Sequence, residues 1–492
     1  MSRTYAITTF GCQMNVHDSE RAAGVLESIG YRRADDSATA DLVLLNTCAV
    51  RENADNKLYG TLGHLKRQKD EHGTSIVVGG CLAQKDGAEI VERAPWVDLV
   101  YGTHNVAELP RLLADLDSES MPVVELIEAL ETYPSALPAK RDVRHHAWVS
   151  ISVGCDNTCT FCIVPTLRGP ERSRRLGDVV AEVQALVDDG VVEVTLLGQN
   201  VNSYGRDLTG RSEFAPLLRA VGEVDGIERV RFTSPHPRDF TEDVLHAMAE
   251  VPSVCEHLHL PLQSGSDDVL RRMRRSYRSR RYLDLVERTR ELMPAASLTT
   301  DIIVGFPGET DDDFERTMEV VAASRFDQAF TFQYSPRPGT PAAEMVDDFV
   351  DPDVVAERYQ RLERLTRDHS QQAHDRLVGQ AHELLVEAPS KTDASRWSAR
   401  TDGNHLVHLP APDDASFAPG DLVHAEVVEA RTNYAIAGPA TSIRRTPAGL
   451  ATAARMAAGA SMADATRPDG FTAPVGAATV TETRRSLPIL SS

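Results

Sequence analysis

The feature that most constrains this sequence is a regular alternation of short apolar runs with helix-length amphipathic segments. Between residues 147 and 340 six strand-length runs occur in this pattern, and each is followed by a polar or Gly/Pro-rich segment. Strand, helix and strand in succession imply a parallel sheet covered by helices. Six such units predict either an open doubly wound sheet or a partial (β/α)6 barrel, which we favour. The runs are 147–153, 193–198, 229–234, 257–262, 298–305 and 329–335.

The remainder of the chain divides where this pattern changes. Four more runs, at 5–10, 41–46, 75–80 and 97–102, alternate with helical segments and predict an N-terminal Rossmann-like domain with a parallel sheet. A segment with three prolines and no periodicity reads as a linker before the central domain. Short runs separated by turns then predict a small antiparallel β-barrel, and an Ala-, Thr- and Gly-rich tail predicts disorder with one short helix near 449–459. The α/β chain is therefore divided into 3–117, a linker at 118–143, 144–375, 376–441 and a tail at 442–492.

Composition excludes several classes of protein. No apolar run approaches the roughly 20 residues of a membrane span, and the first residues lack a secretory signal, so we expect a cytoplasmic protein without a membrane partner. Seven cysteines in such a chain argue for metal or redox chemistry rather than disulfides. The net charge of -21 argues against a nucleic-acid partner. Arginines nevertheless gather at 168–175 and 271–281, which are either solvated faces or parts of a functional site.

Three cysteines lie close together in 154-GCDNTCTFCIVP-165, directly after a predicted strand. Cys155, Cys159 and Cys162, here called the loop set, can ligate three irons of a 4Fe-4S cubane and leave the fourth iron without a protein ligand. That iron can chelate the amino and carboxylate groups of S-adenosylmethionine. The alternative is a zinc site, which needs a fourth ligand. The next candidates, Cys255 and His257, lie far along the chain, so we favour the cluster.

A second group of cysteines is dispersed. Cys12, Cys48 and Cys81, here called the strand-end set, each follow the end of a predicted parallel strand. Carboxyl ends of parallel strands line one edge of a sheet, so these cysteines are predicted to converge on a metal site, the alternative being three unrelated residues. Cys255 is then left over and is predicted to be a small core residue.

Polar residues after the central strands complete the candidate site. In a barrel the loops that follow the strands build the active site, although any one of them taken alone reads equally well as a tight turn. These side chains are candidates for binding the cofactor's carboxylate, its ribose hydroxyls or a substrate base. The candidates are Gln199, Asn200, Asn202, Ser234, His236, Gln263, Ser264 and Ser266.

Together these motifs resemble the radical S-adenosylmethionine methylthiotransferases over roughly residues 3–440. The matching pieces appear in chain order, and the C-terminal region resembles their TRAM RNA-binding domain. Gln-Met-Asn after Cys12, GQNVN at 198–202 and QSGS at 263–266 resemble the branch that acts on isopentenylated adenosine in tRNA. The pieces are GCQMN, NTCAVRE, GGCLAQ, GCDNTCTFCIVP, RGPERSR, LLGQNVNSYG, RFTSPHP, LPLQSGSD and DIIVGFPGET.

The resemblance implies methylthiolation at carbon 2 of N(6)-isopentenyladenosine at position 37 of tRNA. It implies two 4Fe-4S clusters and two molecules of S-adenosylmethionine: the cluster on the loop set cleaves the cofactor to a 5′-deoxyadenosyl radical, and the strand-end set carries the sulfur-transferring cluster. Implied partners are the tRNA anticodon stem-loop, an electron donor such as flavodoxin or ferredoxin, and an iron-sulfur carrier. We expect a monomer.

The sequence departs from the family pattern at two places, and three alternative functions are considered. Asp156 stands where Asn is common, and 389-PSKTDASRW-397 lacks the usual first Gly-Arg of a TRAM domain, which makes the run 271–281 a candidate contact for the tRNA backbone. The alternative substrates are threonylcarbamoyl-adenosine in tRNA and an aspartate of a ribosomal protein. A different class of function is a non-catalytic RNA-binding metalloprotein.

Overall fold

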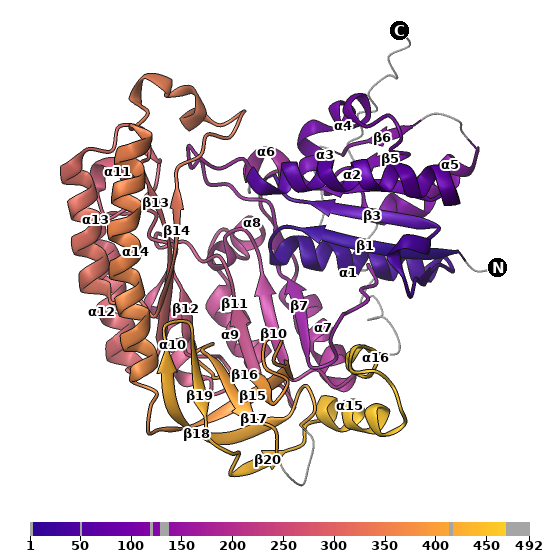
Figure 1. Cartoon of the computed structure of the whole chain (residues 1–492). Helices are drawn as coiled ribbons and strands as arrows, with labels where there is room; N and C mark the ends of the chain where they lie inside the picture. The colour runs from indigo at the N-terminus through magenta and orange to yellow at the C-terminus, as the bar shows by residue number, and fades with distance from the viewer. Residues whose placement is uncertain (1–2, 50–51, 119–121, 128–136, 413–416, 469–492) are drawn as a thin grey trace.

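The computed structural model describes residues 3–49, 52–118, 122–127, 137–412 and 417–468. It consists of an N-terminal sheet domain, a central barrel domain and a small C-terminal barrel beneath the central strands (Figure 1). Among the described residues, no helix is both long and apolar enough to cross a membrane.

The N-terminal domain is a six-stranded parallel sheet with the order β2-β1-β3-β4-β5-β6. Apolar side chains of α1 and α5 pack on one face, and those of α2, α3 and α4 pack on the other. The four predicted strands are present, and β6 comes from the segment that reads as a linker. The elements are β1 (Thr4–Phe10), α1 (Gln13–Ser28), β2 (Arg32–Arg33), β3 (Leu42–Thr47), α2 (Glu52–His72), β4 (Ser75–Gly80), α3 (Cys81–Asp86), α4 (Ala88–Arg93), β5 (Leu99–Tyr101), α5 (Leu109–Ser118) and β6 (Val123–Glu125).

The central domain is a partial barrel. Its six strands form two parallel three-stranded sheets, β7-β10-β11 and β12-β13-β14, which are joined by a bridge between Val230 and Val254. The strands follow chain order without the reversal of a doubly wound sheet, which decides between the two predicted folds. The strands are β7 (His146–Ser150), β10 (Glu193–Leu197), β11 (Arg229–Phe232), β12 (His257–His259), β13 (Ser297–Val304) and β14 (Gln328–Gln333).

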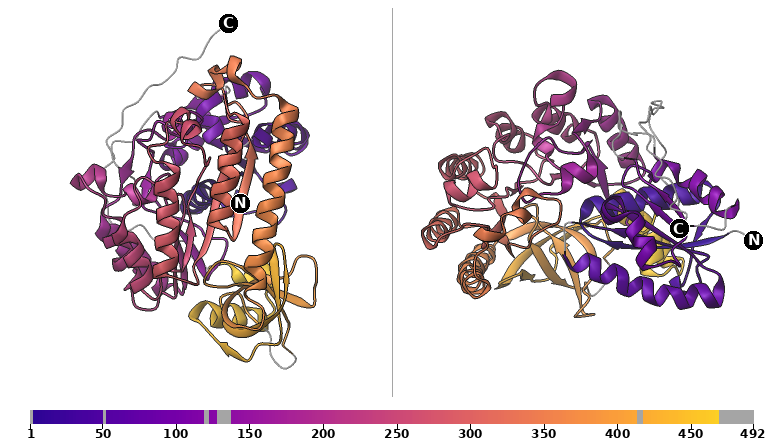
Figure 2. Two further views of the ribbon diagram at one scale, coloured as in Figure 1. Left: turned by 90° about the vertical axis from the view of Figure 1, so that its left-hand side faces the viewer. Right: turned by 90° about the horizontal axis from the view of Figure 1, so that it is seen from above.

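Helices stand outside these strands (Figure 2) and bury an apolar core between helix and strand. A short hairpin, β8 with β9, brackets the segment that carries the loop set. The elements between the strands are β8 (Ser152–Val153), α6 (Val164–Arg168), β9 (Arg172–Ser173), α7 (Leu176–Asp188), α8 (Arg206–Thr209), α9 (Phe214–Gly222), α10 (Glu242–Glu250), α11 (Asp267–Arg272), α12 (Ser279–Leu292), α13 (Asp311–Ser324) and α14 (Pro352–Asp375).

The C-terminal domain is a closed five-stranded β-barrel, which confirms the predicted small barrel; its strands pair antiparallel except β17 with β19, which pair parallel. Strands β15-β16-β17-β19-β18 follow one another and β18 pairs with β15 to close the ring. Arg229 and Arg231, at the start of β11, donate hydrogen bonds to backbone carbonyls of this barrel and attach it to the lower end of the central strands. The strands are β15 (Ala381–Pro389), β16 (Arg396–Arg400), β17 (Leu406–Pro410), β18 (Leu422–Arg431) and β19 (Tyr434–Ala437).

Residues 442–468 have regular structure, although we expected only one short helix there. They form β20 (Ser442–Arg444), α15 (Pro447–Ala457) and α16 (Met462–Thr466). Strand β20 pairs with β18, and Arg144 donates a hydrogen bond of 2.6 Å to the carbonyl of Arg467. These contacts order the segment. They use backbone groups, so the low hydrophobicity from which we expected disorder does not reveal them. Residues 469–492, the rest of the predicted tail, lie outside the described residues.

Candidate active site and metal centres

The loop set lies on a segment whose two ends are tied together. The Cys155 amide donates a hydrogen bond of 3.1 Å to the carbonyl of Gly169, and β8 pairs with β9 beside it. Gly154 has φ +80°, and a Cβ there would lie 2.1 Å from the carbonyl oxygen of Pro170. Only glycine fits this backbone. The chain therefore leaves the strand in one fixed direction and presents all three thiols from a single loop.

Donors from elsewhere face these thiols. The amide of Asn157 donates to Sγ of Cys155 at 3.5 Å, and the buried guanidinium of Arg275 donates to Sγ of Cys159 at 3.5 Å. Burial raises the pKa of Cys155, and raises that of Cys162 to about 12. The thiols of Cys155 and Cys162 are therefore protonated unless a metal displaces the protons. Three thiols with a cationic donor fit a thiolate-ligated cluster.

A cavity of about 190 Å³ opens beside the loop set, at the carboxyl ends of the barrel strands. Four of the predicted cofactor-binding residues line it: Gln199, Ser234, His236 and Gln263. Residues outside the predicted cofactor-binding set complete the lining, among them Asn157, Phe161, His259, Arg275 and Asp301.

The other four predicted residues do not line this cavity and instead form hydrogen bonds with other groups of the protein. Asn200 donates to Asp239 at 2.9 Å, and Ser264 lies 3.2 Å from the hydroxyl of Thr317. Asn202 donates to the carbonyl of His236 at 2.9 Å and accepts from its amide at 2.8 Å. Ser266 caps α11 by accepting from the amides of Asp268 and Val269.

The lining of the cavity includes buried polar atoms without a hydrogen-bond partner among the described residues, and residues with strained backbone. Both amide atoms of Gln199 are buried and have no hydrogen-bond partner among the described residues. Ser234 and Gln263 have φ values of +59° and +66°, a region that costs free energy for any residue with a Cβ. Unpaired buried amides and strained backbone gather where a protein binds a polar ligand. The site therefore fits a polar cofactor placed directly beside the three thiols.

The strand-end set lies at one edge of the N-terminal sheet. Cys12 caps α1, Cys48 follows β3, and Cys81 is the first residue of α3 after β4. A Cβ at Gly11 would lie 2.9 Å from Cβ of Cys48, and one at Gly80, which has φ +95°, would lie 2.3 Å from Oδ1 of Asn46. These glycines allow the strand ends to approach closely.

Asn15 connects two of these strand ends. Its Oδ1 accepts from Sγ of Cys12 at 3.4 Å, and its Nδ2 donates to the carbonyl of Thr47, beside Cys48, at 3.2 Å. Burial raises the pKa of the Cys81 thiol, as in the loop set.

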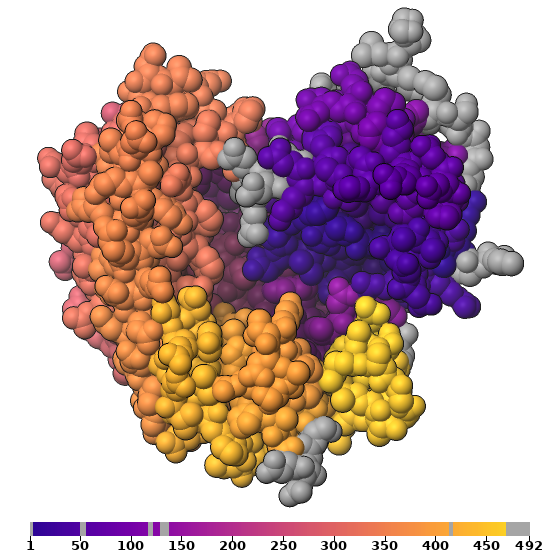
Figure 3. Space-filling view, in the orientation of Figure 1, coloured from indigo at the N-terminus to yellow at the C-terminus, as the bar shows by residue number. Residues whose placement is uncertain are grey.

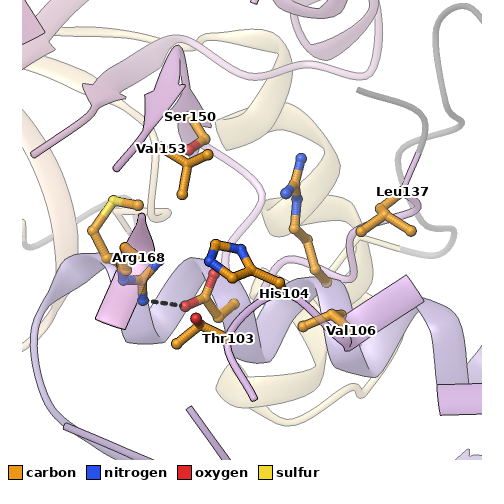
Figure 4. A pocket seen from close by; sticks show the side chains of 10 residues that line it. Thr103, His104, Val106, Leu137, Ser150, Val153 and Arg168 are labelled. Carbon is orange, nitrogen blue, oxygen red and sulfur yellow. Dashed lines mark hydrogen bonds and ion pairs between the residues drawn. The ribbon is translucent and has the colours of Figure 1, made fainter. Parts of the chain in front are cut away.

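Arg168 links the two sets of cysteines. It is the last residue of α6, shortly after the loop set, and its Nη2 lies 3.5 Å from Sγ of Cys81 and 2.6 Å from Oδ2 of Asp18. Figure 4 shows this ion pair beside a small cavity of about 30 Å³ that His104 and Thr103 also line. Arg168 is 5% exposed. The sequence signal was the arginine-rich segment 168–175, whose role as a buried contact between domains became visible only in three dimensions.

The alternative of a zinc site finds no support in the geometry. Within the described ranges, no three His, Cys, Asp or Glu side chains are placed to hold a single metal ion. Neither Cys255 nor His257, the candidates for a fourth ligand, lines the cavity. Cys255 is 2% exposed, as a core residue should be. A cubane places each thiolate on a different iron, so its ligands need not converge on one point.

The basic run 271–281 is not a uniform solvated face. Arg275 is buried against Cys159, while Arg271, Arg272 and Arg280 are ion-paired with Asp268, Asp348 and Asp284. These pairings reduce the positive charge that the run offers to a nucleic acid. A contact between this run and the tRNA backbone stays a prediction.

Three family models match successive parts of the chain. They are the Uncharacterized protein family UPF0004 at residues 4–102, the Radical SAM superfamily at 149–321 and the TRAM domain at 375–439.

Curated relatives match almost the whole chain. The tRNA-2-methylthio-N(6)-dimethylallyladenosine synthase of Salinispora arenicola is 59% identical over 91% of this chain and 90% of its own length. The protein of the same name from Frankia alni is 60% identical over 91% of each chain.

Among solved structures, the radical S-adenosylmethionine methyltransferase TsrM from Kitasatospora setae aligns with a TM-score of 0.52 at 16% identity. The alignment covers 70% of this chain and 75% of that one. This likeness shows a shared fold.

Proposed function

The chain belongs to the family of tRNA-2-methylthio-N(6)-dimethylallyladenosine synthases, which are radical S-adenosylmethionine transferases, and on this premise we propose how its residues divide the reaction. The family reaction adds a methylthio group to N(6)-isopentenyladenosine of tRNA and uses S-adenosylmethionine and two 4Fe-4S clusters. The observation that carries the assignment is the loop set, which borders a cavity with unpaired polar groups.

We assign one cluster to each set of cysteines. Cys155, Cys159 and Cys162 would hold the cluster that faces the cavity, and Cys12, Cys48 and Cys81 would hold the second. When bound, the first cluster supplies the electron that cleaves S-adenosylmethionine and the second supplies sulfur. The guanidiniums of Arg275 and Arg168 each donate to one thiolate, so each offsets negative charge at its own cluster.

The cavity residues orient the cofactor. Gln199 offers an amide donor and acceptor that have no partner within the part of the chain that the structure describes. Burial and the charge of Arg275 lower the pKa of His236 to about 3, so its ring is neutral. Nδ1 of that ring accepts from the amide of Arg238 at 3.2 Å, which leaves the proton on Nε2 as a donor. Ser234 and Gln263 complete the set. These groups suit the carboxylate and ribose hydroxyls of S-adenosylmethionine.

Phe161 helps to keep water from the cluster. It lies between the last two cysteines of the loop set and contacts Phe306 edge to face, with 6.4 Å between ring centroids. A dry site protects a radical from side reactions.

The partners follow from the substrate. We propose that the anticodon stem-loop is the bound part of the tRNA, and that its target base must leave the stack to reach the cavity. The TRAM domain supports an RNA substrate. We further propose that flavodoxin or ferredoxin donates electrons, that an iron-sulfur carrier delivers the clusters, and that the enzyme works as a cytoplasmic monomer. The names of the relatives do not favour threonylcarbamoyl-adenosine or a ribosomal-protein aspartate as the substrate.

Nucleoside mass spectrometry of tRNA tests this function. A strain that lacks the gene should lose 2-methylthio-N(6)-isopentenyladenosine and accumulate N(6)-isopentenyladenosine. The wild-type gene should restore the product, and Cys155→Ala should not. Cys255→Ala, which removes a cysteine outside both sets, should restore it and serves as the matched control. Persistence of the product in the deletion strain would show that the substrate assignment is wrong.

A further inference from the structure

The last strand of the central barrel carries two half-exposed phenylalanines on one face. Phe330 is 44% exposed and Phe332 is 51% exposed, although the neighbouring strand β13 is largely buried. They are two residues apart on β14, so their side chains point to the same side. Large apolar side chains that are left open together mark a binding surface more often than isolated ones do.

The strand register shows which side they face. Phe330 is paired with Asp301 of β13, and Phe332 is paired with Ile303. Asp301 lines the active-site cavity, and Ile303 belongs with Phe161 of the cysteine loop to one apolar cluster. Residues paired across neighbouring strands project to the same side of a sheet. Both phenylalanines therefore face the inside of the barrel, toward the cysteine loop.

A direct contact confirms this direction for Phe330. Its ring centroid lies 6.0 Å from that of His259, edge to face, and His259 lines the cavity. The aromatic face of β14 is therefore continuous with the wall of the site.

The exposure of these rings follows from the open side of the barrel. On its outer face β14 packs against α14, whereas no further described strand extends the sheet beyond β14. In Figure 1 β14 stands across from the N-terminal domain, and Figure 3 shows a hollow in the surface between the central and N-terminal domains. The exposure of both rings leaves them accessible to a substrate.

We propose that Phe330 and Phe332 hold the prenylated adenine of the tRNA, an inference that rests on the function proposed above. A base that leaves an RNA loop loses its stacking partners, and proteins replace them with aromatic side chains. The branched alkenyl group of this base is apolar and gains from contact with further apolar surface. Two positions along a strand span about 7 Å, enough for the purine and its alkenyl group to lie across both rings.

Binding of two synthetic anticodon stem-loops tests the proposal. One carries N(6)-isopentenyladenosine and the other carries unmodified adenosine at the same position. Dissociation constants are measured anaerobically, without reductant, for the cluster-loaded enzyme and for Phe330→Ala, Phe332→Ala and the double variant. Ile29→Ala is the control, because Ile29 is 41% exposed but lies at the opposite end of α1 from Cys12. Iron content and melting temperature check that each variant is folded and loaded.

The wild-type enzyme should prefer the prenylated stem-loop. The double variant should bind that stem-loop at least about fivefold more weakly, since stacking on one aromatic ring is worth roughly 1–3 kcal/mol. Its affinity for the unmodified stem-loop should fall less, and Ile29→Ala should match the wild type. A smaller loss in the double variant, with the wild-type preference present, would overturn this inference alone. A wild-type enzyme without any preference would count against the proposed substrate itself, and so against both.

Discussion

The two sets of cysteines reach their positions by different routes. Cys155, Cys159 and Cys162 lie on one loop. The ends of this loop are fixed by the antiparallel pairing of the short strands β8 and β9 and by a glycine with positive φ. The strand-end set is assembled by the order of a parallel sheet, since β1, β3 and β4 are neighbours and each ends just before one of its cysteines. The close spacing of three cysteines on one loop can be recognised from the sequence alone. The convergence of three cysteines at strand ends can be predicted only if the predicted order of the strands in the sheet is correct.

The surroundings of the two sets also differ. The loop set borders a cavity of about 190 Å³ that contains polar groups without a partner among the described residues, whereas the cavity beside Arg168, near the strand-end set, has about 30 Å³. Each set nevertheless has one buried arginine within 3.5 Å of one thiol. The thiols of the first set therefore line a cavity with room for a ligand, whereas those of the second set do not line the smaller cavity.

The largest effects should come from the glycines that precede the cysteines. Gly154→Ala and Gly80→Ala each place a methyl group on a residue with positive φ, 2.1 Å and 2.3 Å from an oxygen atom. Each should cost about 4 kcal/mol locally, because the strain of a positive φ and the clash of the added methyl group both contribute, and each should lower the iron content of its own cluster only. Anaerobic iron analysis with thermal unfolding measures this.

Gly60→Ala is the matched control, because a Cβ there meets no atom within 4 Å. If Gly154→Ala and Gly80→Ala removed the same cluster, the separate placement of the two sets would be wrong.

A smaller effect is expected from Arg168. Arg168→Gln removes the charged donor to Cys81 and leaves the carboxylate of Asp18, whose side chain is 14% exposed, without its ion-pair partner. Breaking a buried pair costs about 3 kcal/mol, and the strand-end cluster should lose occupancy while the loop-set cluster does not. Adding Asp18→Asn removes the uncompensated charge, so stability should recover while the occupancy stays low. Full occupancy in the double variant would mean that Arg168 acts on stability alone.

The smallest effect concerns Glu171, which lies in the segment after the loop set. Burial raises its pKa to about 7, against the hydrogen bond of 2.6 Å that the hydroxyl of Ser203 donates to it. Because this pKa is raised on folding, the stability that the group contributes is full below about pH 4.5 and is lost as the pH rises through about 7.

Glu171→Gln should therefore gain about 2 kcal/mol relative to the wild type between pH 5 and pH 8. Urea unfolding of the metal-free protein at the two pH values measures this gain, and Glu223→Gln controls for the loss of an exposed carboxylate. If the free energies of unfolding of Glu171→Gln and the wild type differed by the same amount at both pH values, the raised pKa of Glu171 would be contradicted.

Much of the fold was accessible from the sequence because its periodicities are strong. The six central runs, the closed C-terminal barrel and four strands of the N-terminal sheet are present. Strands β2 and β6 escaped prediction because two or three residues at a sheet edge carry no detectable period. Cavity-lining Gln199 could not be separated from neighbouring Asn200, since which of two adjacent polar side chains faces the ligand depends on the exact end of a strand. Arg168 and Arg275 contact Cys81 and Cys159, which lie far from them in the sequence. Their spacing from these cysteines therefore does not indicate that they meet.

Iron and sulfide analysis of three proteins tests the central claim most directly. The fully reconstituted wild-type chain should hold about eight irons, consistent with two 4Fe-4S clusters. Replacing Cys155, Cys159 and Cys162 together by Ala should leave about four irons, and so should replacing Cys12, Cys48 and Cys81. Four irons or fewer in the wild-type protein, or complete loss of iron in either folded variant, would contradict two clusters held independently by the two sets.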